Sequence, residues 1–154
     1  MMEQTLVILK PGTIARGLVG DVLTRFQRKG LKICGMKMMQ LDEPLLREHY
    51  AHLTDRPFFP LILNSMMAYP VIVMVLEGKD AVTVVRSMTG ATNCRKAEPG
   101  TIRGDFGMSG QENIVHASDS PEHARVEIDR FFRPEEIFNY TLPTIGVTYA
   151  PDEL

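Results

Sequence analysis

The chain has 154 residues, of which 44% are hydrophobic and 23% are charged, a composition typical of a folded globular domain and not of a disordered or fibrous chain. Its 17 basic and 19 acidic side chains give a net charge of −2, so no excess of positive charge favours binding to nucleic acid or to an anionic membrane surface. We expect a single domain over residues 1–154, located in the cytoplasm, because Cys34 and Cys94 are too few for a disulfide framework and no signal-peptide or membrane-spanning pattern is present.

Strands and helices alternate in the first part of the chain. The runs Thr5–Leu9 and Val71–Leu76 are wholly apolar, which is typical of strands buried on both faces. Residues 31–41 predict a further strand with a bulge at Gly35, where the alternation of side chains breaks. Apolar stripes at helical spacing predict a helix ending at Gly30. Three more helices are expected to begin at Asp42, at Pro57 and at Asp80.

The second part of the chain contains a long irregular segment. Residues 91–113 are rich in glycine and show no periodicity, and a segment of this length inside a compact domain is usually functional. A short strand over 113–116 and a last helix opened by Ser120 and Pro121 follow. This order predicts an α+β fold with a ferredoxin-like, antiparallel four-stranded sheet covered by helices, which we expect on one face of the sheet. The tail from Pro134 onward is expected to pack over the surface or against a neighbour.

Glu127 interrupts the apolar face of the last helix. Ala124, Ile128 and Phe131 lie on that face by their spacing, and Glu127 falls on the same stripe. A carboxylate turned toward a core is costly unless it is paired, and His116, at the end of the preceding strand, is a suitable partner. Such a pair fixes the tautomer of an imidazole that acts as nucleophile or base. Alternatively, Glu127 reaches solvent and His116 is an ordinary core residue.

Two arginines near the glycine-rich segment predict an anion site. Arg86 lies beside the buried face of its helix, and Arg103 precedes Gly104 and Asp105. Guanidinium groups match phosphate oxygens two at a time, and glycines let a loop bend closely around an anion. Alternatively, Arg86 is a favourable charge at the end of a helix, Arg103 is a solvated loop residue, and Asp105 pairs with a loop arginine.

Phe58 and Ile62 form a second apolar face on the helix expected after Pro57. A helix in a small domain cannot easily bury two faces, so an aromatic ring left open there could stack on a flat ligand such as a nucleobase. Ordinary core packing or an oligomer contact is the alternative. The chain has no Walker A loop, no dinucleotide fingerprint, no histidine–cysteine cluster with metal spacing and no serine-nucleophile elbow.

Two segments resemble the signature of the nucleoside diphosphate kinases. They are Pro99–Phe106, which reads PGTIRGDF, and Asn113–Ser120, which reads NIVHASDS. The likeness extends in the right order over nearly the whole chain, through Lys10-Pro11, Arg16–Gly20, Glu48–Tyr50, Asp55–Phe59, Gly90–Asn93 and Phe132–Glu136.

This resemblance implies a ping-pong exchange of the γ-phosphate, mainly from ATP, between nucleoside triphosphates and diphosphates. It implies that His116 attacks through Nδ1 and becomes a phosphohistidine, and that Glu127 orients its ring. It further implies phosphate contacts at Arg86, Thr92 and Arg103, sugar and phosphate contacts at Lys10 and Asn113, base stacking on Phe58, and supporting roles for Tyr50 and Ser118.

The resemblance also implies partners and a cofactor. Mg²⁺ is expected to arrive with the nucleotide and not on a metal site of the chain. Nucleoside di- and triphosphates are the expected ligands, with neither a membrane nor a nucleic acid as partner. Homo-oligomers, either hexamers or tetramers, are expected, and the long tail favours the hexamer. A neutral imidazole can attack phosphorus without a separate base, and arginines, a lysine and Mg²⁺ can cancel charge on the transferred group.

The chain departs from the family pattern at two places. Gly12 and Thr13 replace the usual Asp-Gly after Lys10, so we expect the turn there to differ while the lysine is retained. Ala117 replaces the usual glycine after His116, which leaves a contact to its backbone carbonyl available. Two other functions remain open: a non-catalytic nucleotide-binding regulatory module on the same fold, and a scaffold or nucleic-acid binder, which the net charge disfavours.

Overall fold

The computed structural model describes all 154 residues and contains one antiparallel four-stranded sheet. The strands lie in the order β2-β3-β1-β4, which confirms the predicted α+β class and ferredoxin-like sheet. The register of β2 on β3 shifts between Ile33 and Gly35, where the bulge was predicted. The strand bounds are β1 (Glu3–Leu9), β2 (Lys32–Met39), β3 (Val71–Gly78) and β4 (Val115–Ala117).

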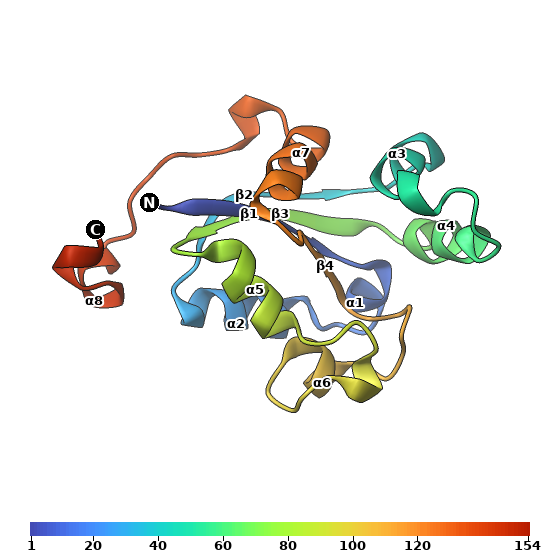
Figure 1. Cartoon of the computed structure of the whole chain (residues 1–154), viewed down its shortest axis with the longest axis horizontal. Coiled ribbons are helices and arrows are strands. Elements are labelled where there is room, and N and C mark those ends of the chain that lie inside the picture. The colour runs from blue at the N-terminus through green and yellow to red at the C-terminus, as the bar shows by residue number, and fades with distance from the viewer.

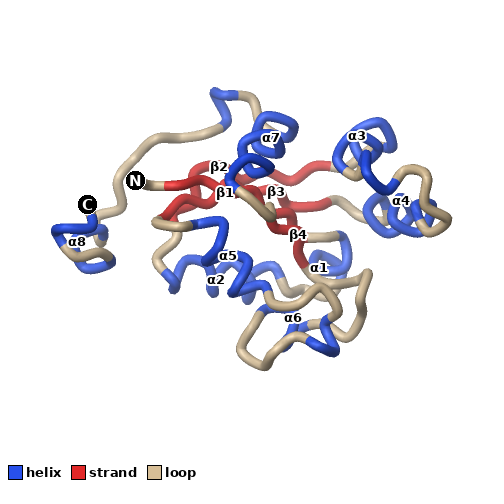
Figure 2. The backbone as a smooth tube through the Cα atoms, viewed as in Figure 1, coloured by secondary structure: helices blue, strands red, loops and turns tan.

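Helices cover both faces of the sheet, so the expectation of helices on one face is wrong (Figure 2). Successive side chains of a strand point to opposite faces, and β1 therefore supplies two cores. Val7 and Leu9 pack in one core with residues of α2 (Val19–Lys29) and α5 (Ala81–Thr89). Leu6 and Ile8 pack in the other core, whose helical residues come from α3 (Glu43–His49), α4 (Phe59–Met67) and α7 (Pro121–Phe131).

Capping side chains begin two helices at the predicted residues. The Asp42 carboxylate accepts the backbone N–H of Leu45 at 3.0 Å at the start of α3. The Ser120 hydroxyl accepts the backbone N–H of His123 at 3.1 Å at the start of α7. Each side chain satisfies a backbone donor that the first helical turn leaves without a partner.

Two other predicted helix starts need correction. The helix expected to begin at Pro57 begins at Phe59, and a different proline, Pro60, occupies its first turn. Asp80 precedes α5 as predicted, but it adopts a left-handed backbone with φ of 50° and its side chain makes no capping bond. The irregular segment contains η2 (Cys94–Lys96) and α6 (Ile102–Phe106). Two further short helices, α1 (Pro11–Ala15) and η1 (Ala51–Leu53), lie earlier in the chain.

The tail packs along the chain's own surface and carries three short helices, η3 (Pro134–Glu136), α8 (Ile145–Thr148) and η4 (Pro151–Glu153). The backbone N–H of Phe138 donates to the carbonyl of Cys34 at 2.8 Å, and the Tyr149 hydroxyl accepts the backbone N–H of Lys79 at 3.0 Å. These bonds bring the end of the chain close to its start (Figure 1). No helix has the length and apolar character that crossing a bilayer requires.

Candidate active site

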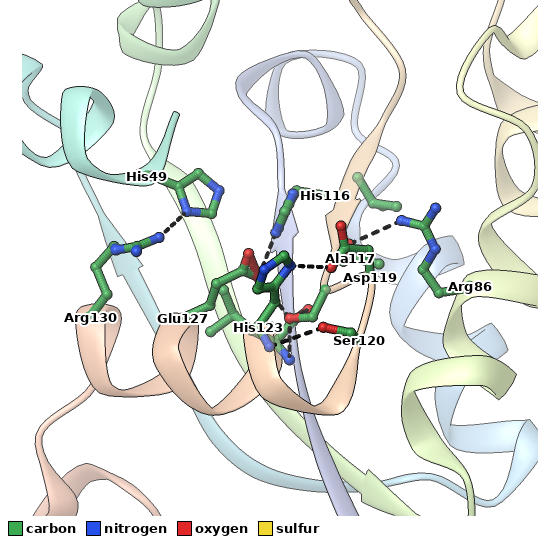
Figure 3. Close-up of polar contacts among 12 residues, drawn as sticks. His49, Arg86, His116, Ala117, Asp119, Ser120, His123, Glu127 and Arg130 are labelled. Atoms are coloured by element: carbon green, nitrogen blue, oxygen red, sulfur yellow. Dashed lines mark hydrogen bonds and ion pairs between the residues drawn. The ribbon is translucent and has the colours of Figure 1, made fainter. Parts of the chain in front are cut away.

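His116 faces α7 because of the alternation of side chains along β4. Its neighbours Val115 and Ala117 are buried in the core that contains α2 and α5. The side chain of His116, which pairs with Ile8 of β1 in the sheet, therefore projects to the opposite face. Glu127 of α7 lies on that face, and the two side chains point toward one another (Figure 3).

A hydrogen-bonded triad links His116, Glu127 and Ser118. Nε2 of His116 lies 2.8 Å from Oε1 of Glu127, and the Ser118 hydroxyl donates to the same oxygen at 2.7 Å. The side chain of Glu127 is only 12% exposed, so the alternative in which it reaches solvent is wrong. Burial by itself raises the pKa of Glu127, but the bonds from the His116 ring and the Ser118 hydroxyl outweigh it and lower the pKa to about 2.

The ionised carboxylate fixes the tautomer of His116. A carboxylate can only accept hydrogen bonds, so Nε2 of His116 carries the proton and Nδ1 keeps its lone pair. Nδ1 makes no hydrogen bond in the structure, and His116 lines a cleft of about 600 Å³. The imidazole therefore offers an unengaged nucleophilic nitrogen beside a cavity large enough for a small polyanion.

The same cleft gathers most of the residues that the sequence nominated. Thr92 and Asn113 are linked by a bond from the Asn113 amide nitrogen to the Thr92 carbonyl at 3.0 Å. Tyr50 also lines the cleft, and burial, followed by the nearby charge of Glu127, raises the pKa of its hydroxyl to about 12. The nominated residues in the lining are Lys10, Tyr50, Arg86, Thr92, Arg103, Asn113, His116 and Glu127.

Arg103 is buried without a carboxylate partner. Its guanidinium donates to three backbone carbonyls, those of Asn113 at 3.0 Å, Gly90 at 3.1 Å and Val115 at 2.7 Å. Only 7% of the residue is exposed, and burial lowers its pKa. The solvated-loop alternative is therefore wrong. Carbonyl dipoles hold the guanidinium in place but do not neutralise it, so its charge remains available to an anion.

Lys10 and Arg86 add two more cations that make no ion pair. Nζ of Lys10 donates to the Asn113 side chain at 2.6 Å, and Nη1 of Arg86 donates to the carbonyl of Ala117 at 3.3 Å. That carbonyl is the contact expected to survive the replacement of glycine by Ala117. Burial and the charge of Arg103 lower the pKa of Lys10 to about 8, against an opposing effect of Glu112. We call Lys10, Arg86 and Arg103 the cation group.

Phe58 and Ser118 are the nominated residues that do not line the cleft. Phe58 occupies the residue before α4 and is 45% exposed, while its neighbour Phe59 is buried. Ser118 is fully buried and reaches the site only through its hydroxyl, which donates to Glu127 within the triad. Asp105 pairs with an arginine, but the partner is Arg25 of helix α2, at 2.6 Å, and not the loop arginine of the alternative.

The residue before β4 is strained. Ile114 has a φ of 75°, a left-handed conformation that a β-branched side chain rarely adopts. Its carbonyl accepts the backbone N–H of Lys10 at 3.0 Å and the Thr13 hydroxyl at 2.6 Å. These bonds span the turn in which Gly12 replaces the usual aspartate. They tie the segment that carries Asn113 to the end of β1.

Sequence reasoning missed three residues next to the triad. His49 is buried on α3, and its Nδ1 lies 2.9 Å from Nη1 of Arg130 on α7 (Figure 3). Glu48 lies 3.4 Å from Nε of the same arginine. A histidine on an otherwise apolar helical stripe was the signal available in the sequence, but its arginine partner is 81 residues away. We call His49, His116, Glu127 and Arg130 the histidine group.

Comparisons with known proteins agree with one another. Residues 3–137 match the family model described as nucleoside diphosphate kinase. A protein of that name from Parabacteroides distasonis is 58% identical over 152 residues, which cover 99% of both chains. One from Pyrococcus horikoshii is 52% identical over 141 residues, which cover 90% of both chains.

Solved structures resemble the whole chain. A halophilic nucleoside diphosphate kinase from Halobacterium salinarum, in complex with CDP, superposes with a TM-score of 0.94 and 41% identity. The match covers 97% of this chain and 99% of that one. The apo enzyme from Encephalitozoon cuniculi superposes with a TM-score of 0.91 and 37% identity, and the match covers 96% and 99% of the two chains.

Proposed function

The chain belongs to the nucleoside diphosphate kinase family, and from this membership we propose that it moves a γ-phosphoryl group, mainly from ATP, to nucleoside diphosphates through a phosphohistidine on His116. The observation that carries the proposal is the bond between Nε2 of His116 and Glu127. It leaves Nδ1 free in a cleft that also contains the cation group.

The transfer proceeds in two in-line displacements. In the first, Nδ1 of His116 forms a bond to the γ-phosphorus, and the bond from that phosphorus to the β,γ-bridging oxygen breaks, so a nucleoside diphosphate leaves. In the second, a terminal oxygen of another diphosphate attacks the phosphorus and the N–P bond breaks. The proton on Nε2 stays in place throughout, and the Glu127 carboxylate stabilises the charge that the ring gains.

The cation group binds the phosphates in this scheme. Three cationic side chains with no ion pair favour a ligand with several negative charges. Asn113 holds Nζ of Lys10 at 2.6 Å through its amide oxygen, which orients the ammonium toward the same ligand. We assign the base to Phe58, whose exposed ring can stack on any nucleobase without reading its edges.

Mg²⁺ enters as part of the substrate in this proposal. The carboxylates in the cleft are already engaged: Glu127 with His116, Asp119 with His123, and Glu48 with Arg130. The cleft therefore offers no free pair of carboxylates for a metal of its own. Mg²⁺ bound to the phosphates would neutralise charge on the transferred group.

We also propose a cytoplasmic homo-oligomer, either a hexamer or a tetramer. Both cysteines are free and buried, as expected in a reducing compartment. Met36 and Met38 are about half exposed on β2, an edge strand of the sheet, and Val147 of α8 is 89% exposed. Apolar side chains of this kind on an edge strand favour association. Light scattering of the purified chain measures the number of subunits.

The experiment that tests the catalytic proposal is brief incubation with γ-labelled ATP and Mg²⁺. We expect a phosphate on the protein that is stable to alkali and lost in acid, and that leaves when a nucleoside diphosphate is added. His116→Ala abolishes the label because it removes the nucleophile, while His123→Gln, which changes an exposed histidine of the same cleft, retains it. Nucleotide binding without labelling of the unmodified protein would instead indicate a non-catalytic module.

A further inference from the structure

One buried imidazole has no role in the mechanism described above. His49, at the end of α3, is 7% exposed, and its ring packs edge to face against three aromatic neighbours. The ring centroids lie 4.7 Å from Tyr50, 4.6 Å from His116 and 5.2 Å from Phe131. A polar ring in such surroundings needs partners for both of its nitrogens, so the question is what each nitrogen does.

Arg130 fixes the tautomer of His49. Nη1 of Arg130 lies 2.9 Å from Nδ1 of His49, and a guanidinium only donates hydrogen bonds and does not lose its proton in proteins. Nδ1 must therefore accept the bond, and the single proton of the neutral ring resides on Nε2. Burial, with smaller effects from nearby charged groups, lowers the pKa of His49 to about 3. The ring is therefore neutral.

The Nε2–H group of His49 points at the nucleophile. Nε2 is buried and has no nitrogen or oxygen partner, and in Figure 3 it lies on the side of the ring that faces His116. The two ring planes are inclined at 78° in an edge-to-face arrangement. When the N–H edge of one imidazole is directed at the face of another, the two rings form an N–H···π contact.

We propose that His49 is a positioning residue for the reaction: its Nε2–H, oriented by Arg130, holds the plane of the His116 ring and thereby aims Nδ1 at the phosphorus. The bond to Glu127 fixes one edge of the His116 ring but leaves the ring free to rock about that bond. A second contact, against the ring face, removes this freedom. The inference rests on the proposed function, because it assigns His49 to the phosphorylation of His116.

A metal ion is a poorer explanation of the same cluster. His49, His116 and Glu127 offer three ligand atoms that all lie within 4.8 Å of one another. However, the guanidinium of Arg130 is bonded to one nitrogen of His49, and its positive charge opposes a cation there. The remaining nitrogen of His49 carries a proton, so it has no lone pair for a metal.

The test compares four variants of the full chain. His49→Phe keeps an aromatic ring but loses the N–H and the acceptor for Arg130. Arg130→Met keeps His49 but frees its tautomer. His49→Gln supplies an amide oxygen for Arg130 and an amide N–H for the ring face. Arg125→Met, an exposed arginine on the same helix, is the matched control.

Single-turnover labelling by ATP gives the main result. We expect the phosphorylation rate of His116 to fall about tenfold in His49→Phe and in Arg130→Met, because misaimed reacting atoms slow an in-line attack. The dissociation constant for ADP stays within about twofold. His49→Gln retains a rate within about threefold of the unmodified protein, and the control is unchanged. A ¹⁵N–¹H spectrum of the histidine rings shows His49 as the Nε2–H tautomer, which Arg130→Met loses.

Three results overturn the inference. They are a phosphorylation rate within about twofold of the unmodified protein in His49→Phe and Arg130→Met, a loss of ADP affinity that matches the loss of rate, and an Nδ1–H tautomer at His49. If His49→Phe does not fold, Arg130→Met and the spectrum decide. An unmodified protein that binds ATP but never becomes phosphorylated contradicts the proposed function itself, and that outcome is separate from a labelled protein whose rate is insensitive to His49.

Discussion

The cation group and the histidine group lie in the same cleft but treat charge in opposite ways. Lys10, Arg86 and Arg103 are bonded to an amide oxygen or to backbone carbonyls, and none of them makes an ion pair. In the histidine group, by contrast, the Glu127 carboxylate is bonded to the His116 ring, and Arg130 pairs with Glu48. One group leaves its charge uncompensated, and in the other the charged side chains of Glu127 and Arg130 each have a partner.

Under the proposed function, this difference separates phosphate binding from the orientation of the His116 ring. Partly buried cations without counter-ions cost stability in the free protein, and an incoming polyanion removes that cost, so the cation group favours phosphates. A balanced network gains little from a charged ligand, but its mutual hydrogen bonds hold one ring in one orientation. We therefore expect substitutions in the two groups to have different kinetic effects.

The largest expected effect follows from Arg103→Met, which removes one cation and leaves three carbonyls without a donor. We expect the rate of phosphoryl transfer to fall about 10³-fold, because charge on the transferred group is no longer stabilised, and nucleotide affinity to fall with it. Steady-state kinetics measures both effects. The control is Arg47→Met, an exposed arginine paired with Glu43 on α3. A loss below about tenfold would contradict the role given to the cation group.

Glu127→Gln tests the histidine group and keeps an oxygen that can accept from Nε2 of His116. We expect the rate of His116 phosphorylation to fall about 100-fold, because a neutral amide does not stabilise the charge on the ring. Affinity for ADP is expected to be retained, which rapid-quench labelling and equilibrium titration together can establish. Equal losses of rate and affinity would show that the histidine group contributes to nucleotide binding as much as to the orientation of His116.

The pH dependence of binding should reveal Lys10 within the cation group. Its pKa is lowered to about 8, so the ammonium is largely charged at pH 7, is half neutral near pH 8 and is largely neutral at pH 9. We expect ADP affinity to weaken about tenfold between pH 7 and pH 9. Lys10→Arg should flatten this dependence, because the guanidinium stays charged. Calorimetric titrations at several pH values measure it, and an equally steep profile in the variant would exclude Lys10 as the cause.

The smallest expected effect is on acid stability. The pKa of Glu127 is lowered to about 2 in the folded chain, so its ionised form stabilises the fold above the unfolded pKa. That stabilisation, of the order of 2 kcal/mol, is lost as the pH falls from about 5 to about 2. Thermal unfolding of the protein and of Glu127→Gln should therefore converge over this range. A constant difference between their melting temperatures would indicate that the carboxylate does not titrate there.

Sequence patterns predicted the parts of the fold that depend on local chemistry. The apolar runs of β1 and β3, the bulge at Gly35 and the caps at Asp42 and Ser120 follow from residues close together in the chain. The start of α4 was misplaced because two prolines three residues apart both fit a first helical turn. The single helical face was wrong because a strand buried on both faces requires helices on both.

In the candidate site, too, some residues could be predicted from the sequence and others could not. The stripe of α7 identified Glu127 as an anomaly, the two arginines near the glycine-rich segment predicted an anion site, and the resemblance to a family added Lys10. None of these identified His49 as a neighbour of His116, because the contact depends on how α3 and α7 approach β4 across the sheet. Nor could spacing predict that the guanidinium of Arg103 would end on three carbonyls from two separate segments.

The backbone at Ile114 has a consequence for the order of folding. An isolated segment would avoid the left-handed conformation seen there, so residues near Asn113 gain no native geometry from local preference. The carbonyl of Ile114 is secured by Lys10 and Thr13, about a hundred residues earlier in the chain. We expect this corner to acquire its native shape only after the first and last strands have paired, so a partly folded chain would have no competent cleft and the nascent protein would become able to bind nucleotide in a single late step.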